Sequence, residues 1–363
     1  MRLKEVVLEI AKTVGVFALV RDSAWRRRRL LILCYHGVSM DDEHEWSPTL
    51  YVTQAKLRER LKSLRDGGYT ILPLSEATRR LYDGTLPPRS VALTFDDGAI
   101  DFERRALPVL REFNAPATLY LTTFYCVSRQ PVFDTVLSYV LWKGRTSSTD
   151  VSSLCGSPEP LGVATEAQRK KTRNAIYDYA AREQMSAEQK NELVARLAGM
   201  VGVDYEQILD RGTLQIMTPD MVRALPADLV DVQLHTHRHR TPRDHALFVR
   251  EIRDNAQMIR ELRGSANPLE QFCYPSGDYA GEFFDWLREC DVRYATTCVP
   301  DLASSDSDPM LVPRFIDTML QSNTVFEAWT SGFAALLPRK AEYQLDASRV
   351  NVSRTRSATV SAM

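Results

Sequence analysis

The chain has 363 residues, of which 44% are hydrophobic and 26% charged, with a formal net charge of −1 at pH 7 and a pI near 6.6. This length allows one large or two ordinary domains with an ample core. The near-neutral charge argues against a nucleic-acid-binding protein, for which a basic domain is expected. Six cysteines show neither C-x-x-C spacing nor a dense disulfide framework, so reduced thiols in a cytosol are the simplest interpretation.

The first 29 residues combine an amphipathic segment with a basic turn. Apolar residues recur at helical spacing between Leu3 and Val20, but charged residues interrupt this run, which is too short and too polar for a signal peptide or a transmembrane anchor. Arg26 to Arg29 follow directly. Two interpretations stay open: a helix packed on the rest of the chain with a solvated basic turn, or an interfacial helix beside anionic lipid.

Strands and helices alternate from residue 30 onward. Leu30 to Cys34 predicts a first strand that ends at Tyr35-His36, where His36 could line a pocket or make a structural hydrogen bond. We expect helices over 53–67, 75–82 and from Asp97 to residue 110, with strands at 69–72, 91–93 and 117–121. This alternation favours a β/α architecture.

Two adjacent acids, Asp96 and Asp97, follow the apolar strand at 91–93 within the sequence Thr94-Phe95-Asp96-Asp97-Gly98. In α/β sheets and barrels the carboxyl ends of the strands build the pocket. Adjacent carboxylates repel each other unless a cation or a proton separates them. One acid could therefore face a metal while the other faces a substrate water; the alternative is a solvated turn after an edge strand.

The regular alternation stops after residue 121, and about residues 124–217 form an insertion with expected helices at 166–181 and 187–200. An excursion of this length is usually functional. Its aromatic residues Phe133, Tyr139 and Trp142 could cover a pocket and stack on a sugar, or could form the insertion's own small core.

A second strand, Leu229 to Leu234, runs into His235-Thr236-His237-Arg238-His239, so that three of the six histidines lie within five residues. Two imidazoles, one carboxylate and an open position are typical of a catalytic zinc site. The spacing of His235 and His239 lets both rings reach one ion from a helix face or a tight loop. His237, between them, should point away.

These motifs resemble those of the polysaccharide deacetylases of carbohydrate esterase family four, the NodB-homology group. Thr94 to Gly98 matches the first motif of that family and His235-Thr236-x-x-His239 matches the second. The resemblance covers about residues 30–335 apart from the insertion. It implies a distorted, incomplete (β/α) barrel in which Asp96 is the general base, while Asp97, His235 and His239 bind a divalent metal, with zinc the expected ion.

A third segment, Phe272 to Gly277, resembles the family motif whose backbone amide helps to form the oxyanion hole, a role that falls here on Ser276. Cys273 stands where many members carry an arginine that pairs with the base, and Ser276 replaces an aromatic residue. No histidine follows His245, so the C-terminal histidine that serves many members as general acid is missing. Tyr35-His36-Gly37-Val38 resembles a variant found among deacetylases of bacterial surface and exported polysaccharides.

His36, Tyr274 and Arg314 are the candidate substrate-binding residues. Arg314 lies near the end of the last expected strand, 311–316, and could hold an anionic substrate group, hold the base, or form an ordinary surface ion pair. Asp285-Trp286 looks like a fourth motif of the family but lies in an expected helix, which favours core packing. Residues 336–363 contain few apolar residues and form a tail predicted to be disordered.

The resemblance implies a metal-dependent hydrolase that removes N-acetyl groups from a sugar or polysaccharide precursor, with Asp96 as base and a metal-bound water as nucleophile. The proton donor to the leaving amine could be Asp96 or His36. A deformylase or O-deacetylase of a lipid-linked sugar is one alternative, and a non-catalytic glycan-binding module, which the intact Asp96 disfavours, is another. We expect a cytoplasmic location, with peripheral contact at the inner membrane through residues 3–29.

Overall fold

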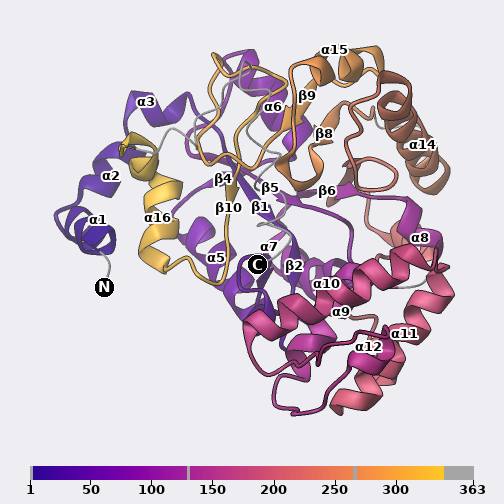
Figure 1. Ribbon diagram of the computed structural model, residues 1–363. Coiled ribbons are helices and arrows are strands. Elements are labelled where there is room, and N and C mark those ends of the chain that lie inside the picture. Colours follow the sequence, from indigo (N-terminus) through magenta and orange to yellow (C-terminus); the bar gives the residue numbers. More distant parts are fainter. Residues whose placement is uncertain (1–2, 129–130, 265–267, 339–363) are drawn as a thin grey trace.

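The computed structural model describes residues 3–128, 131–264 and 268–338, arranged around a curled sheet of parallel strands (Figure 1). The strand order is β10-β1-β5-β6-β7-β8-β9, with β4 paired to the first residues of β5. A separate parallel pair is formed by β2 (Gly37–Val38) and β3 (Tyr51–Val52). The strands of the main sheet are β1 (Leu31–Tyr35), β4 (Thr70–Ile71), β5 (Ser90–Phe95), β6 (Ala117–Leu121), β7 (Val230–Leu234), β8 (Gln271–Cys273), β9 (Tyr294–Thr296) and β10 (Phe315–Ile316).

The two edges of the main sheet are linked through Val312. Its N–H donates to Ala295 O and its carbonyl accepts from the Thr297 N–H, each at 2.9 Å, beside β9. Three residues later Phe315 pairs with Leu33 of β1. The strand expected over 311–316 is thus shared between both edges, and only its last two residues form β10. This curled parallel sheet confirms the distorted, incomplete (β/α) barrel.

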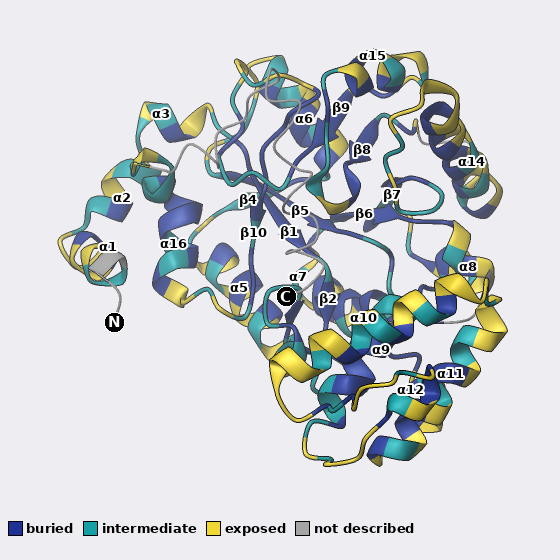
Figure 2. Cartoon of the chain, viewed as in Figure 1, coloured by how far each residue is buried: buried dark blue, intermediate teal, exposed yellow. Residues whose placement is uncertain are grey.

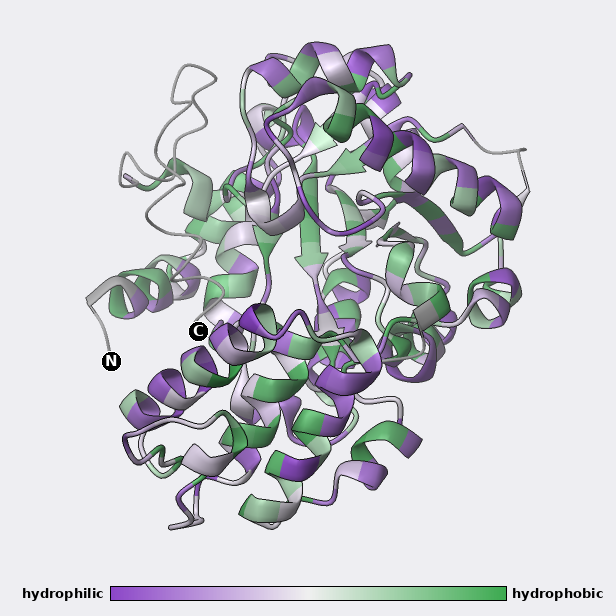
Figure 3. Cartoon of the chain, turned by 45° about the vertical axis from the view of Figure 1, so that its right-hand side comes forward, coloured by the Kyte–Doolittle hydropathy of each residue, from purple (hydrophilic) through white to green (hydrophobic). Residues whose placement is uncertain are grey.

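Helices surround the sheet, and the strands between them are almost wholly buried and hydrophobic (Figures 2 and 3). Side-chain caps mark several helix starts: the Thr53 hydroxyl accepts from the Lys56 N–H, and Thr218, which precedes Pro219, accepts from the Met221 N–H. The surrounding helices are α4 (Glu43–Trp46), α5 (Gln54–Asp66), α6 (Leu74–Tyr82), the π-helical turn η1 (Phe102–Ala106), α7 (Leu107–Phe113), α13 (Pro219–Ala224), α14 (His245–Arg263), η3 (Pro275–Gly277), α15 (Glu282–Glu289), α16 (Asn323–Ser331) and η4 (Phe333–Leu336).

The insertion is mainly helical, as expected, and has its own hydrophobic cluster. Tyr139 is buried in that cluster and Trp142 packs against it, so these two aromatic residues serve the insertion's core. The insertion's helices are α8 (Phe124–Ser128), α9 (Phe133–Lys143), η2 (Ser152–Leu154), α10 (Glu166–Arg182), α11 (Ala187–Val201) and α12 (Tyr205–Asp210). The sequence pattern did not indicate α9, because its β-branched and aromatic residues have modest helix propensity and its apolar residues, leucines included, lie on most sides of the helix.

The insertion rejoins the barrel directly beside the pair of adjacent acids. The Met217 N–H donates to Gly98 O at 3.0 Å, and the Ile100 N–H donates to Gln215 O at 2.8 Å. These bonds hold the end of the insertion against the loop that carries Asp97. The insertion therefore borders the pocket end of the sheet.

Residues 3–29 form three short helices where one was expected: α1 (Leu3–Thr13), α2 (Val16–Arg21) and α3 (Ala24–Arg27). The break falls at Gly15, whose φ of 81° is left-handed and suits glycine. Leu8, Ala11 and Phe17 are buried against Ala328 of α16, so part of this segment packs on the barrel.

The basic turn is only partly solvated. Arg26 is fully buried and donates to the backbone carbonyls of Thr330, Arg29 and Ser90 at 3.1, 2.7 and 3.2 Å. Arg27 and Arg28 are exposed. No helix in the described ranges is both long enough and apolar enough to cross a membrane. The tail predicted over 336–363 lies, from residue 339 onward, outside the described residues.

Candidate active site

Asp96 and Asp97 lie at the carboxyl end of β5, where the chain turns sharply. Asp97 has a φ of 71° and Gly98 a φ of 86°. A left-handed conformation is uncommon for an aspartate and marks backbone strain of the kind that gathers at functional sites. Gly98 is required for a second reason, since a Cβ there would lie 2.3 Å from Leu121 Cδ1. The turn lets the two carboxylates face different partners.

His235 and His239 come from the tight loop after β7 and converge on Asp97. Asp97 Oδ1 lies 3.1 Å from His235 Nε2 and 3.2 Å from His239 Nε2. Thr236 and His239 adopt left-handed φ values of 62° and 54°, which reverse the chain so that both rings reach the same carboxylate. Of the two geometries open to this spacing, the loop is the one that forms.

The chemistry of this group fits a divalent metal. His235 Nδ1 lies 2.9 Å from the Cys273 carbonyl, which can only accept, so Nδ1 holds the proton and Nε2 presents its lone pair. Burial opposes ionisation of Asp97, but His239 and His235, when they are protonated, outweigh it and lower the pKa of that carboxyl. Two imidazoles and one carboxylate are a donor set of catalytic zinc sites. The residues therefore fit the metal that the family resemblance implies.

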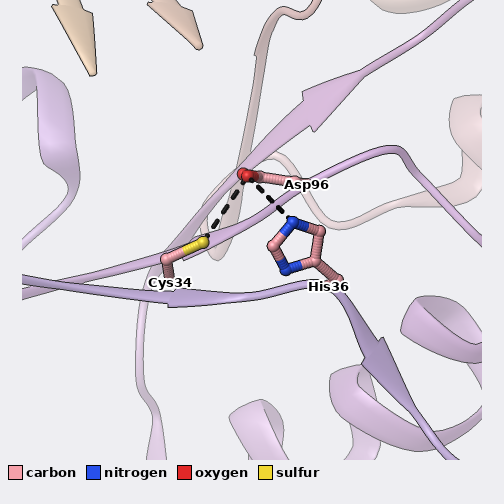
Figure 4. A group of neighbouring side chains, drawn as sticks. All are labelled: Cys34, His36 and Asp96. Carbon is pink, nitrogen blue, oxygen red and sulfur yellow. Dashed lines mark hydrogen bonds and ion pairs between the residues drawn. The ribbon is translucent and has the colours of Figure 1, made fainter. Parts of the chain in front are cut away.

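A second group, Cys34, His36 and Asp96, also gathers three metal-ligating side-chain types (Figure 4). Cys34 Sγ and His36 Nε2 lie 3.5 and 3.8 Å from Asp96 Oδ2. Burial raises the pKa of the Cys34 thiol well above its ordinary value, so the thiolate that a metal requires is disfavoured. Both oxygens of Asp96 already accept from an arginine. This group is better described as a base and its neighbours.

That arginine is Arg314, which forms a bidentate ion pair with Asp96. Nη1 lies 2.7 Å from Oδ1 and Nη2 lies 2.8 Å from Oδ2, and both side chains are buried. Burial alone would raise the pKa of Asp96, but Arg314 outweighs it and holds that pKa well below its usual range. Of the three roles considered for Arg314, the structure shows the pairing with Asp96. Because Arg314 is fully buried, it neither contacts a substrate nor forms a surface ion pair, and these two interpretations are wrong.

In the third motif, the side chains of Tyr274 and Ser276 have opposite environments. The Tyr274 ring is buried, and its hydroxyl donates to Met310 O at 3.1 Å, so this side chain supports the core and is not placed to contact a substrate. Ser276 is exposed and left-handed, with φ 57° and ψ 13°, in the loop after β8. That loop leaves the same end of the sheet as Asp96 and the histidines. The Ser276 N–H stays the candidate oxyanion donor.

Two further sequence interpretations are confirmed. His237 points away from the candidate metal-ligand group (Asp97, His235 and His239), with Nδ1 2.8 Å from Thr123 Oγ1. Trp286 packs against Phe248 and Phe283 in the core, while Asp285 is exposed on the same helix. The resemblance of Asp285-Trp286 to a fourth motif therefore has no counterpart in the site.

Two polar residues that sequence analysis did not single out hold the histidine loop. Asn255 accepts from the His235 N–H at 2.9 Å, and Glu251 accepts from the Arg238 N–H at 2.8 Å and from Arg240 at 2.7 Å. Both lie on α14, four residues apart, and both are buried. Polar residues at this spacing on the apolar face of an expected helix were the available signal.

Comparisons with known proteins find polysaccharide deacetylases in sequence and in fold. A family model for polysaccharide deacetylase matches residues 83–139. The chain is 31% identical over 101 residues to the poly-beta-1,6-N-acetyl-D-glucosamine N-deacetylase of Escherichia coli (strain K12). The aligned region covers 28% of this chain and only 15% of that protein. Its fold is similar to that of the Streptococcus pyogenes deacetylase PplD in complex with acetate (TM-score 0.54, 17% identity, 85% of this chain and 99% of that one). It is also similar to IcaB from Ammonifex degensii (TM-score 0.53, 17% identity, 84% and 97%).

At this low identity the solved structures show the fold, and the motifs carry the family assignment. The matched residues 83–139 contain β5 and the two adjacent acids. The histidine loop and the third motif lie outside that match, yet the fold brings His235 and His239 onto Asp97. The fold, the matched segment and the assembled site together support a polysaccharide deacetylase domain of the NodB-homology type.

Proposed function

We propose that the protein removes N-acetyl groups from a sugar or polysaccharide precursor in a reaction that depends on a divalent metal, zinc being the expected ion. The observation that carries the proposal is the convergence of His235 and His239 on Asp97, next to an Asp96 that Arg314 keeps ionised. The E. coli relative is named for a polymeric N-acetylglucosamine substrate. That relative is matched over only 15% of its length, so its substrate supports the proposal without fixing it.

Each residue of the site has a distinct role in the proposed reaction. Asp97, His235 and His239 would hold the metal, which when bound supplies Lewis-acid polarisation of the acyl carbonyl and acidifies water. Asp96 accepts a proton from the attacking water. The Ser276 N–H donates to the oxygen on which negative charge develops, and the loss of one such donor typically raises a barrier by about 3 kcal/mol.

The identity of the acyl group that the protein removes can be tested directly. Purified protein would be given N-acetylated, O-acetylated and N-formylated sugars, with acetate or formate release measured before and after treatment with a chelator. The proposal requires acetate release from N-acetylated sugars that the chelator abolishes and added zinc restores. Release from O-acetyl or formyl substrates alone would favour the deformylase or O-deacetylase alternative, and no release from any sugar would favour a glycan-binding module.

His36 is the proposed proton donor to the leaving amine. It lies between β1 and β2, is partly exposed, and its Nε2 lies 3.8 Å from Asp96 Oδ2 (Figure 4). It therefore borders both the base and the solvent side of the pocket. No other imidazole contacts Asp96 within 4.0 Å in the described ranges.

We expect His36→Gln to lower kcat on an N-acetylated sugar by about a hundredfold or more, the usual contribution of a general acid. The loss should be much smaller on 4-nitrophenyl acetate, because its leaving group departs without a proton. Steady-state kinetics on both substrates test this. Equal losses on the two substrates would contradict the role of His36 as proton donor.

We also propose that residues 3–29 contact a membrane surface, with the protein on the cytoplasmic face of the inner membrane. Val7, Ile10 and Val14 are exposed at helical spacing, Leu19 is exposed on α2, and Arg27 and Arg28 lie nearby in sequence. An apolar row with flanking basic residues suits the interface of an anionic bilayer. All six cysteines are free thiols, which suits a reducing compartment.

The protein should co-sediment with vesicles that contain anionic lipid and not with neutral vesicles, and raised salt should release it. Ile10→Ser combined with Val14→Ser should weaken vesicle binding several-fold because it removes apolar burial. Leu320→Ser is the matched control, because Leu320 is 64% exposed, close to the 57% and 66% of Ile10 and Val14, but lies elsewhere. Equal effects of the two changes would count against membrane contact, and cell fractionation tests the location.

A further inference from the structure

A cavity of about 490 Å³ lies between the barrel and the insertion, lined by Met40, Arg104, Arg105 and Arg211. Three of its four lining residues are arginines, and the four residues come from three separate parts of the chain. Arg104 and Arg105 belong to η1, Met40 follows β2, and Arg211 follows α12 in the insertion. The fold has therefore concentrated positive charge in a hollow that no part of the proposed reaction uses.

The guanidinium groups of Arg104 and Arg105 have no ion-pair partner among the described residues. Arg104 Nη1 donates to Arg211 O, and Arg105 Nη2 donates to Met40 O at 3.2 Å, so these bonds go to neutral carbonyls. Arg105 Nε is buried and finds no hydrogen-bond partner in the described part of the chain. A buried donor without a partner is costly, so the protein alone leaves the Arg105 guanidinium incompletely satisfied.

Arg211 has an acidic partner, unlike the other two arginines. Its Nη1 lies 3.4 Å from Asp41 Oδ2, and Lys143 Nζ lies 3.3 Å from the same oxygen and 2.8 Å from Asp42 Oδ2. Two carboxylates thus balance these two cations, and the excess of positive charge in the cavity comes from Arg104 and Arg105. Planar guanidinium groups with free N–H donors bind phosphate and carboxylate oxygens in a bidentate manner.

The segments that line the cavity also build the proposed active site. Arg104 and Arg105 follow Asp97 by seven and eight residues, and Met40 follows His36 by four residues. The end of the insertion that carries Arg211 rejoins the barrel at Gly98 through the Met217 N–H. These segments all leave the carboxyl end of the sheet, so the cavity and the acids share one end of the barrel.

We infer that this arginine cavity binds an anionic group of the substrate, a phosphate or a carboxylate carried on the same molecule as the N-acetyl sugar. Assignment of the anion to the substrate rests on the proposed deacetylase function, whereas anion binding by the cavity does not. A phosphate would come from a sugar phosphate or a lipid-linked sugar, and a carboxylate from an acidic sugar of the glycan. A substrate of neutral sugars alone would leave the cavity without a ligand.

Isothermal titration with inorganic phosphate and with glucuronate, at constant ionic strength, tests the inference and separates the two sources. We expect saturable binding of at least one of them by the intact protein and none of glucose. Arg104→Gln should weaken that binding at least tenfold, since the loss of a charge-assisted hydrogen bond typically lowers affinity by a factor of about ten or more. Arg111→Gln on α7 is the matched control: it removes the same charge from an exposed position outside the cavity and should leave affinity unchanged.

Two outcomes would overturn the inference: no saturable binding of either anion by the intact protein, or equal weakening by Arg104→Gln and Arg111→Gln. An anion could also bind at a metal held by Asp97. The titration is therefore repeated with Asp97→Asn, in which binding at the cavity should persist; its loss there would assign the anion to the metal site and refute the cavity. Since this readout needs no turnover, failure of the proposed deacetylation would leave it interpretable.

Discussion

Asp97→Asn is expected to yield a protein with little bound metal and no deacetylase activity, whereas Asp96→Asn should retain its metal and lose activity. Asp97 is the carboxylate on which both His235 Nε2 and His239 Nε2 converge, at 3.1 and 3.2 Å. Replacing it removes the only negative charge of that group. Asp96 faces Arg314 instead, so its loss leaves the metal-ligand group intact.

The expected loss for Asp96→Asn is about a hundred- to ten-thousandfold in kcat at full metal occupancy, the usual contribution of a positioned base. The substitution also leaves the buried Arg314 without its charged partner and should cost stability. Metal content by elemental analysis, kcat and the midpoint of urea unfolding are therefore measured on each folded variant. Near-normal turnover of Asp96→Asn with the metal in place would refute the proposed mechanism and favour a structural or binding role for the metal.

The elements that carry the acids and the histidines could be predicted closely because short-range patterns define them. The strands predicted at 91–93 and 229–234 form as β5 (Ser90–Phe95) and β7 (Val230–Leu234). The acids and the histidines were placed at strand ends by the change from an apolar run to polar residues. What the pattern could not supply was conformation: the left-handed φ at Asp97, Thr236 and His239 is strained and was not apparent from the side chains.

Arg314 shows why long-range partners were harder to predict. The sequence showed that Cys273 replaces the arginine expected beside the base, and it left Arg314 with several roles. Only the fold shows that β10 lies beside β1, which brings Arg314 onto Asp96 from 218 residues away. Arg314, beside β10, thus supplies the positive charge that Cys273, at the end of β8, lacks. Arg314 Nη2 also lies 3.0 Å from Cys273 Sγ. Tyr274 likewise looked available for substrate until the fold buried its ring.

Arg314→Gln is expected to destabilise the protein by about 3–5 kcal/mol, because it leaves the carboxylate of Asp96 buried without a counter-charge. It should also move the acidic limb of the kcat/KM profile to higher pH. Burial raises the pKa of Asp96 and Arg314 lowers it. Without Arg314 the raised pKa protonates the base at a higher pH, so activity is lost earlier as the pH falls. Arg314→Lys keeps the charge but not the bidentate geometry. Its stability and the position of its acidic limb should therefore lie between those of the unchanged protein and those of Arg314→Gln.

The buried ion pair of Arg60 with Asp317 provides a control for stability alone. Arg60 Nε lies 2.9 Å from Asp317 Oδ2, and both side chains are as deeply buried as those of Arg314 and Asp96. Arg60→Gln should lower the free energy of unfolding by a similar amount, because it also leaves a buried carboxylate unpaired. Its pH profile should match that of the unchanged protein, since Asp317 takes no part in the reaction. A shifted acidic limb in Arg60→Gln, or an unshifted one in Arg314→Gln, would show that Arg314 acts through stability and does not set the ionisation of the base.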